Sequence, residues 1–218
     1  MSGSFPVFDG VLQHAIGCLT PLRALDVGAG AGKYGHLLAA VAPACQRSAI
    51  ERDPACVQQH GLESLYHRVW VGDTAAWLAQ AQPEVFDLVL IGQCLEQNLK
   101  SAGLDLLQAL VHRCAWLVVV AAEHAAPVVI DQVAQAPNLS VWTERDLNWH
   151  DLWAWDHCRS TTLLVLRGLL PSPLSLAQLV DAINAADVPL RHFDGVTPVR
   201  PARLRLVEQR RELDYRPL

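Results

Sequence analysis

An acid followed by three closely spaced glycines is the stretch of this sequence best suited to binding a reactive ligand. Asp26 lies near the end of an apolar run over residues 22–27, which is typical of a buried parallel strand. The pattern over residues 33–41 predicts a helix. Between them stand three glycines at alternate positions, Gly28, Gly30 and Gly32. A strand that breaks into a glycine-rich turn before a helix forms a pocket for a nucleotide-like ligand.

The spacing in this turn argues against two common nucleotide pockets. A Walker loop needs four residues before its Gly-Lys-Ser/Thr, but three separate Gly28 from Gly32, and Tyr34 replaces the hydroxyl residue. The dinucleotide pattern needs glycine where Lys33 stands. Asp26 would repel a pyrophosphate but suits a cationic ligand. S-adenosylmethionine (SAM) carries a sulfonium and an ammonium and has no phosphate. The alternative is a plain glycine-rich turn in which Asp26 serves as a capping or turn residue.

By residue 73 the chain resembles the class I SAM-dependent methyltransferases. The segment from Asp26 to Gly30 is similar to their first motif, Glu51 to the acid that binds the ribose hydroxyls, and Asp73 to the acid that meets the adenine amino group. The resemblance covers residues 20–168 and implies SAM as cofactor. All three acids are expected at carboxyl ends of parallel strands, where such sheets bind ligands. The implied cofactor-binding residues are Asp26, Gly28, Ala29, Gly30, Tyr34, Glu51, Arg52, Gly72, Asp73, Thr74 and Gln93.

A narrower resemblance is to bacterial methyltransferases whose fourth strand leads into an Asp-Val-Leu-Glu-His motif. It rests on the Gly-Lys-Tyr-Gly stretch at 32–35, the strand-like run 86–91 and Glu96. That group is often associated with small-molecule or glycan modification. Gln93 stands where the group has Asp, and Gln97 where it has His. Neutral amides cannot take up a proton at neutral pH, so these departures weaken the case for general-base or metal-assisted chemistry.

Catalytic candidates should follow the fourth and fifth strands, above the sulfonium. Methyl transfer is an in-line displacement, so positioning can supply much of the catalysis, and a base is needed only for a poorly ionised hydroxyl or a protonated amine. Glu96 and His124 are the catalytic candidates. Glu96 also fits a charge at a helix N-terminus, and His124 a solvated loop residue. The wider set is Gln93, Glu96, Gln97, Glu123 and His124, and no metal site is expected.

Two later segments admit several interpretations. Tryptophans are concentrated in the segment 142–155. They could form an aromatic wall for a sugar or planar substrate, pack in the core, or form a dimer interface. His150 and His157 in that segment could face a substrate. Seven of the seventeen Lys and Arg residues follow residue 190. These arginines could form a solvated face around a hairpin, bind an anionic substrate, or contact another copy of the chain.

The elements that must position these residues alternate between strands and helices. Such alternation predicts an α/β fold, a Rossmann-like open seven-stranded, mostly parallel sheet with helices on both faces, plus a small C-terminal α/β appendage. We expect a SAM-binding domain over 1–168, with a lead-in helix within 1–20, and an extension over 169–218 with a helix and an Arg-rich hairpin. Strands are expected at 22–27, 46–51, 66–71, 86–91, 116–121, 152–157 and 161–167, helices at 7–19, 33–41, 104–111, 126–136 and 174–186, a helical turn at 143–147, and a hairpin or exposed strand at 204–215.

Composition limits the partners of this 218-residue chain. Its net charge of −5 gives no general attraction to nucleic acid or membranes. No apolar run reaches membrane-spanning length, and the first residues lack the basic segment of a signal peptide. We therefore expect a cytoplasmic protein. Six cysteines without a Cys-x-x-Cys pair favour reduced thiols.

The sequence thus favours a methyltransferase that moves a methyl group from SAM to an oxygen or nitrogen of a small molecule or saccharide. The departures at Gln93 and Gln97 motivate an alternative, a catalytically impaired SAM-fold protein that binds or scaffolds a partner. An NAD-linked enzyme is disfavoured by Asp26. A homodimer through the C-terminal extension or the Trp-rich segment is possible on this sequence.

Overall fold

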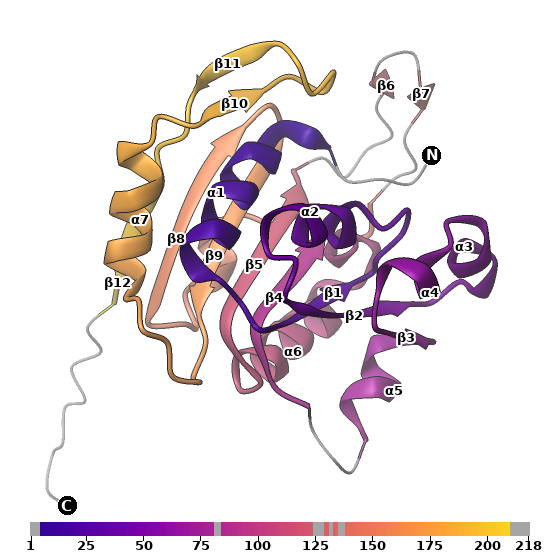
Figure 1. Ribbon diagram of the computed structural model, residues 1–218. Helices are drawn as coiled ribbons and strands as arrows, with labels where there is room; N and C mark the ends of the chain where they lie inside the picture. The colour runs from indigo at the N-terminus through magenta and orange to yellow at the C-terminus, as the bar shows by residue number, and fades with distance from the viewer. Residues whose placement is uncertain (1–4, 81–83, 124–128, 131–132, 135–137, 210–218) are drawn as a thin grey trace, which may run out of the picture.

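The two most apolar runs of the chain form the centre of an eight-stranded sheet in the computed structural model (Figure 1). The structure describes residues 5–80, 84–123, 129–130, 133–134 and 138–209. The strands of the main sheet, in their spatial order, are β12 (Arg205–Glu208), β8 (Leu152–Cys158), β9 (Thr161–Arg167), β5 (Cys114–Ala122), β4 (Phe86–Gly92), β1 (Arg23–Val27), β2 (Gln46–Glu51) and β3 (Arg68–Val71). The neighbouring strands among β3, β2, β1, β4 and β5 pair in parallel. The three pairings β5–β9, β9–β8 and β8–β12 are antiparallel. The carboxyl ends of five parallel strands therefore meet at one edge, where ligands of open α/β sheets bind.

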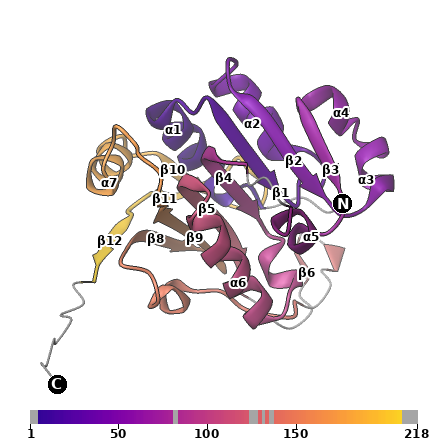
Figure 2. The ribbon, with the colours of Figure 1, turned by 90° about the horizontal axis from the view of Figure 1, so that it is seen from below.

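Helices cover both faces of this sheet. The α-helices are α1 (Asp9–Leu19), α2 (Lys33–Val41), α3 (Pro54–Gln59), α4 (Leu62–Leu65), α5 (Thr74–Leu78), α6 (Lys100–Val111) and α7 (Leu176–Ala185), and the 3-10 helices are η1 (Pro6–Phe8), η2 (Leu95–Gln97) and η3 (Glu144–Leu147). Side chains of a strand alternate between faces. Leu88 and Leu90 pack with α1, α2 and α7, whereas Val89 and Ile91 pack with α6. Figure 2 shows α1 and α2 on one side of the sheet and α6 on the other.

The predicted fold class is confirmed, with one correction to the strand number. The mostly parallel open sheet has eight strands instead of seven, because residues 205–208 pair with β8 as an edge strand. Of the two alternatives for residues 204–215, a hairpin or an exposed strand, the described part forms the edge strand β12, and a hairpin of the C-terminal extension consists of β10 (Pro189–Arg191) and β11 (Pro198–Pro201). Residues 210–218 lie outside the described residues. The division of the chain after residue 168 stays a prediction.

Arginines of the C-terminal segment, residues 200–205, bind it to β8. Arg200 donates to both carboxylate oxygens of Asp156, at 2.6 and 3.2 Å, and the Asp156 side chain is 7% exposed. The backbone of Arg203 donates to the same carboxylate at 2.9 Å. Arg205 lies over the Trp155 ring, 5.1 Å from its centroid. These arginines act within the chain, which favours a structural reading over an anion-binding one.

The Trp-rich segment is part of the core. Trp142 and Trp153 are buried on the α6 face, and the Nε1 of Trp142 donates to the Ser140 hydroxyl at 2.8 Å. His150 contacts the carbonyl oxygen of Arg167 through its Nε2. This supports packing and gives no support to an aromatic wall for a substrate.

The predicted helix over 126–136 is wrong where the chain is described. Two short strands, β6 (Val129–Ile130) and β7 (Val133–Ala134), pair antiparallel there. β-Branched residues favour strands over helices. The capped turn at 143–147 is confirmed as η3, whose Thr143 and Asp146 form a capping box. All six cysteines carry free thiols, and within the described part of the chain no helix is long and apolar enough to cross a bilayer.

Candidate functional site

The glycine-rich turn after β1 is held against β2 by backbone hydrogen bonds. The backbone N–H groups of Gly28 and Ala29 both donate to the carbonyl oxygen of Ile50, at 2.8 and 3.1 Å. Gly28 and Gly30 adopt positive φ angles of 75° and 52°, which L side chains rarely adopt. A Cβ on Gly28 would lie 2.7 Å from the Cβ of Cys94. Glycine at this position thus lets the turn pass close to the segment that follows β4.

Two acids at neighbouring strand ends complete this side of the site. The carboxylate of Glu51 accepts from the backbone N–H of Gly30 at 2.8 Å and from that of Asp53 at 2.9 Å. Asp73 caps α5, because one of its oxygens accepts from the N–H of Ala75 at 2.7 Å. The first carboxylate is therefore oriented beside the glycine-rich turn, and the second keeps one oxygen for another partner.

A cavity of about 950 Å³ brings most of the predicted residues together at this edge. This is near the upper end of the size range of small-molecule pockets. The predicted residues that line it are Gly28, Ala29, Gly30, Tyr34, Glu51, Arg52, Gly72, Asp73, Thr74, Gln93, Glu96 and Gln97. Among the lining residues that the sequence interpretation missed are Phe5, Lys33, Cys94, Asp105 and Asn138.

Asp26 differs from the other predicted residues because it lies beneath the turn and does not line the cavity. Its side chain is 1% exposed, and one oxygen accepts from the Tyr66 hydroxyl at 2.5 Å. That hydroxyl oxygen accepts in turn from the N–H of Gly35 at 2.9 Å. Burial raises the pKa of Asp26 to about 7, the Tyr66 hydrogen bond opposes the rise, and the Glu51 charge adds to it. Asp26 therefore supports the turn from below.

Gln93 follows β4 and reaches across to the start of the described chain. It has a φ of 50°, unusual for a residue other than glycine, and its Oε1 accepts from the backbone N–H of Phe5 at 2.9 Å. The Lys33 ammonium donates to the Phe5 carbonyl at 3.0 Å and pairs with Asp9 at 2.5 Å. Phe5 is thereby fixed over the cavity. Lys33 thus links Phe5 to Asp9 inside the protein.

Glu96 is the most buried acid in the cavity wall. Its side chain is 1% exposed, and one of its oxygens accepts from the backbone N–H of Ala122, at the end of β5, at 2.9 Å. Its second oxygen has no hydrogen-bond partner among the described residues. Burial raises the pKa of Glu96 to about 7, and the backbone N–H groups of Ala122 and of Glu96 itself oppose the rise. A carboxyl group with this pKa can exchange a proton near neutral pH.

The other catalytic candidates lie elsewhere. Glu123 is absent from the cavity wall, and its carboxylate pairs with the Nε2 of His157 at 2.8 Å and accepts from the Thr162 hydroxyl. Burial raises the pKa of Glu123, and His157 opposes the rise. His124 lies outside the described residues. Among the residues that the structure describes, no cluster of His, Cys, Asp and Glu could hold a metal ion.

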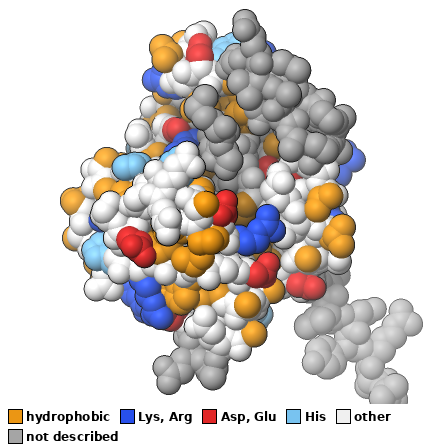
Figure 3. Space-filling model, turned by 90° about the vertical axis from the view of Figure 1, so that its right-hand side faces the viewer, with side chains coloured by type: hydrophobic (Ala, Val, Ile, Leu, Met, Phe, Trp, Pro, Cys, Tyr) orange, Lys and Arg blue, Asp and Glu red, His pale blue; other side chains and the backbone are white. Residues whose placement is uncertain are grey.

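The cavity has an acidic balance. Glu51, Asp73, Glu96 and Asp105 line it, against the cations Lys33 and Arg52. Because Lys33 is neutralised by Asp9, which lies outside the cavity wall, the negative side dominates. Figure 3 shows acidic and basic side chains interspersed over the described part of the face on which α3 and α4 lie. The site thus favours a ligand with positive charge over a phosphate group.

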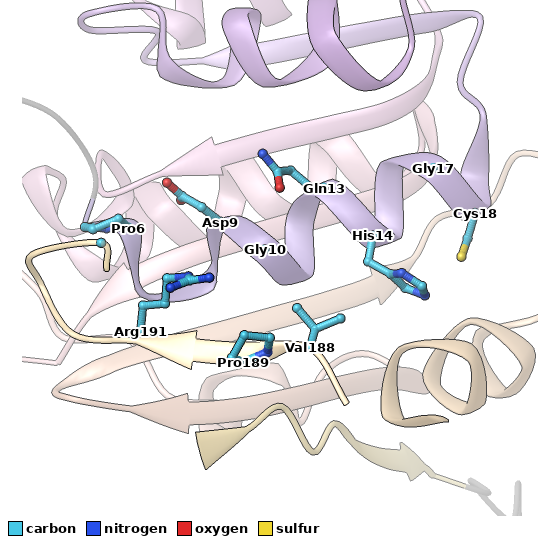
Figure 4. A pocket seen from close by; sticks show the side chains of 11 residues that line it. Pro6, Asp9, Gly10, Gln13, His14, Gly17, Cys18, Val188, Pro189 and Arg191 are labelled. Carbon is cyan, nitrogen blue, oxygen red and sulfur yellow. The ribbon is translucent and has the colours of Figure 1, made fainter. Parts of the chain in front are cut away.

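A second hollow of about 710 Å³ lies between α1 and β10. Figure 4 shows α1 on one side of it, with Asp9 and His14, and Pro189 and Arg191 on the other. Its charged groups are already engaged, because Asp9 pairs with Lys33 and Arg191 donates to the carbonyl of Val196. This hollow therefore offers less unsatisfied chemistry than the cavity at the strand ends.

Solved structures share this fold at low sequence identity. TehB from Haemophilus influenzae matches with a TM-score of 0.56 and 12% identity, over 73% of this chain and 62% of its own. The N-terminal domain of EvdMO1, crystallised in the presence of S-adenosylhomocysteine (SAH) and D-fucose, matches with a TM-score of 0.54 and 16% identity, over 77% of this chain and 84% of its own. Human N-acetylserotonin methyltransferase in complex with SAM matches with a TM-score of 0.53 and 16% identity, over 74% of this chain and 52% of its own. The chain has the class I methyltransferase fold.

These likenesses concern the fold. The chain spans less than two thirds of the length of TehB and of the human enzyme. No protein-family model matches the sequence, and neither does any curated protein.

Proposed function

We propose that this protein is a SAM-dependent methyltransferase that acts on an oxygen or nitrogen of a small molecule or saccharide. The observation that carries the proposal is the acidic cavity at the carboxyl edge, in which the glycine-rich turn, Glu51 and Asp73 meet. SAM fits this donor set because it is cationic and bears ribose hydroxyls and an adenine amino group, all of which carboxylates bind. The SAM and SAH complexes among the structural neighbours support the same cofactor.

The residues proposed to hold SAM have separate tasks. The turn from Gly28 to Gly30 gives close backbone approach, Glu51 accepts from the ribose hydroxyls, and Asp73 accepts from the adenine amino group. Tyr34, Arg52, Gly72, Thr74 and Gln93 complete the wall. SAM would supply an electrophilic methyl group on a sulfonium. The protein would position the acceptor beside the methyl group, and the contacts of Phe5 with Gln93 and Lys33 hold that part of the cavity wall in place.

Calorimetric titration with SAH and with SAM tests the cofactor. We expect Glu51→Gln to weaken SAH binding about 10- to 100-fold, because a charged hydrogen-bond acceptor is lost. Glu63→Gln, which removes an exposed acid on α4, is the matched control and should bind like the wild type. No heat from either ligand in a folded wild-type sample would refute the proposal.

The alternative is a catalytically impaired protein that uses the same fold to bind a partner. It is favoured by the two amides, since Gln93 contacts Phe5 and Gln97 donates to Asn138 at 3.0 Å, both in structural bonds. SAH binding without transfer of the SAM methyl group to any compound of a broad acceptor panel would favour this alternative.

A further inference from the structure

Two buried polar atoms in the cavity wall are left for a ligand. The Nε2 of Gln93 and one carboxylate oxygen of Glu96, Oε2, are both buried, and neither has a hydrogen-bond partner within the described part of the chain. A buried polar group without a hydrogen-bond partner destabilises the folded protein. Both atoms belong to the segment that follows β4, beside the glycine-rich turn. Because Gln93 and Glu96 line the same cavity, one ligand bound there could form a hydrogen bond with each of the two atoms.

The orientation of both side chains is set by the protein. Gln93 must direct its oxygen at the N–H of Phe5, which can only donate, so its NH₂ group is the unpaired end. Glu96 directs Oε1 at the N–H of Ala122, so Oε2 is its free oxygen. The cavity thus presents one fixed donor and one fixed acceptor.

These two atoms select among acceptor groups. An attacking amine uses its single lone pair to form the new bond, so it cannot also accept a hydrogen bond from Gln93. A hydroxyl oxygen has two lone pairs and one proton. It can attack with one pair, accept from Gln93 with the other, and give its proton to Glu96. A hydroxyl therefore satisfies both unpaired atoms in the act of reaction.

We propose that the methyl acceptor is a hydroxyl compound, held by Gln93 Nε2 and deprotonated by Glu96 Oε2. This inference rests on the proposed methyl transfer. The acceptor O–C bond forms as the C–S bond breaks, the electron pair of that bond stays on sulfur, and the acceptor proton passes to the Glu96 carboxylate. The products are a methyl ether, SAH and a carboxylic acid that later releases its proton to solvent.

The burial of Glu96 suits this role. Its pKa, raised to about 7, makes it a stronger base than an exposed carboxylate while leaving a large ionised fraction above neutral pH. Among the described residues, the other titratable and charged groups around the same cavity are Tyr34, Cys94, Asp105, Glu51, Asp73, Lys33 and Arg52.

Three variants separate the roles. Glu96→Gln keeps an oxygen for the N–H of Ala122 but cannot take a proton. Gln93→Glu keeps an oxygen for the N–H of Phe5 but replaces the free donor by an acceptor. Glu63→Gln is the matched control, because Glu63 is an exposed acid on α4 that does not line the cavity.

The first measurements need no turnover. In calorimetry we expect Glu96→Gln to bind SAH within about 3-fold of the wild type, a small change on the free-energy scale. In infrared spectra of the ligand-free protein, carboxylic acid absorption from both Asp26 and Glu96 should titrate near pH 7, and Glu96→Gln should remove the Glu96 part of it while the Asp26 part remains. A wild type that does not bind SAH would refute the proposed function itself. SAH binding together with the same carboxylic acid absorption in the wild type and in Glu96→Gln would overturn the role of Glu96.

The transfer assay uses radiolabelled SAM with catechol and D-fucose, and with 1,2-diaminobenzene as the amine counterpart of catechol. We expect label on oxygen, a kcat lowered about 10²- to 10⁴-fold in Glu96→Gln with little change in KM, and a raised KM in Gln93→Glu. The Glu63→Gln rate should match the wild type. Label on nitrogen alone, an undiminished rate in Glu96→Gln, or SAH binding without transfer to any hydroxyl compound would each overturn the inference.

Discussion

Asp26 gives the protein a pH dependence opposite to that of most carboxylates. Its pKa is about 7 in the folded protein against 3.8 for an ordinary aspartate. Between these values the folded state keeps the proton and the unfolded state has lost it. Stability contributed by this group is therefore present at low pH and is lost as the pH rises toward 7. The difference of about three pKa units corresponds to a loss on the order of 4 kcal/mol over the whole window.

Asp26→Asn removes the ionisation while keeping an oxygen for the Tyr66 hydroxyl. We expect the wild type to lose about 3 kcal/mol of stability relative to this variant between about pH 5 and about pH 8. Urea unfolding at each pH, with linear extrapolation to water, measures the difference. Asp187→Asn is the control, because that aspartate is 66% exposed. Its stability should follow the wild type at every pH.

Tyr66→Phe tests the cause of the effect. The Tyr66 hydrogen bond lowers the pKa of Asp26, so its removal should move the pH-dependent loss to higher pH. The variant should also be less stable at every pH, since the N–H of Gly35 loses its partner. A stability difference between wild type and Asp26→Asn that stays constant from about pH 5 to about pH 8 would refute the burial argument.

Gly92→Ala tests the cavity wall, and Arg200→Ala, with Arg203→Ala as its control, tests the contact of the C-terminal segment with β8. Gly92→Ala would place a Cβ 2.3 Å from a ring carbon of the buried Tyr34, so we expect a loss of about 1–3 kcal/mol in urea unfolding and at least about 10-fold weaker SAH binding in calorimetry. Unchanged binding would show that Tyr34 can move without cost. Arg200→Ala leaves the carboxylate of Asp156 buried without its main partner and should cost roughly 2–3 kcal/mol. Arg203→Ala, whose ion pair is exposed, should cost less than about 1 kcal/mol, and equal losses for the two would contradict this explanation.

Local patterns were sufficient to predict which residues beside the glycine-rich turn line the cavity. A strand, a glycine-rich turn and an acid at the end of each neighbouring strand are features of short stretches, and they placed Glu51 and Asp73 at the cavity wall. The same patterns did not orient Asp26. Residues two apart in a strand share a face, so Asp26 follows Ala24 to the face under α1 and α2, away from the cavity. Tyr66, its partner, is 40 residues away and carries no local signal for this contact.

The rest of the site depends on pairs that are distant in the sequence. Gln93 and Phe5 are 88 positions apart and meet only because β4 ends beneath the start of the chain. The ring of Phe5 packs in turn on Phe193, with centroids 4.6 Å apart, so the hairpin of β10 and β11 supports the cover of the cavity. The C-terminal segment thus supports the candidate site, although no motif in its sequence predicted a binding role. A damaged hairpin, as in Phe193→Ala, should therefore loosen Phe5 and alter SAH affinity without any direct contact to the glycine-rich turn.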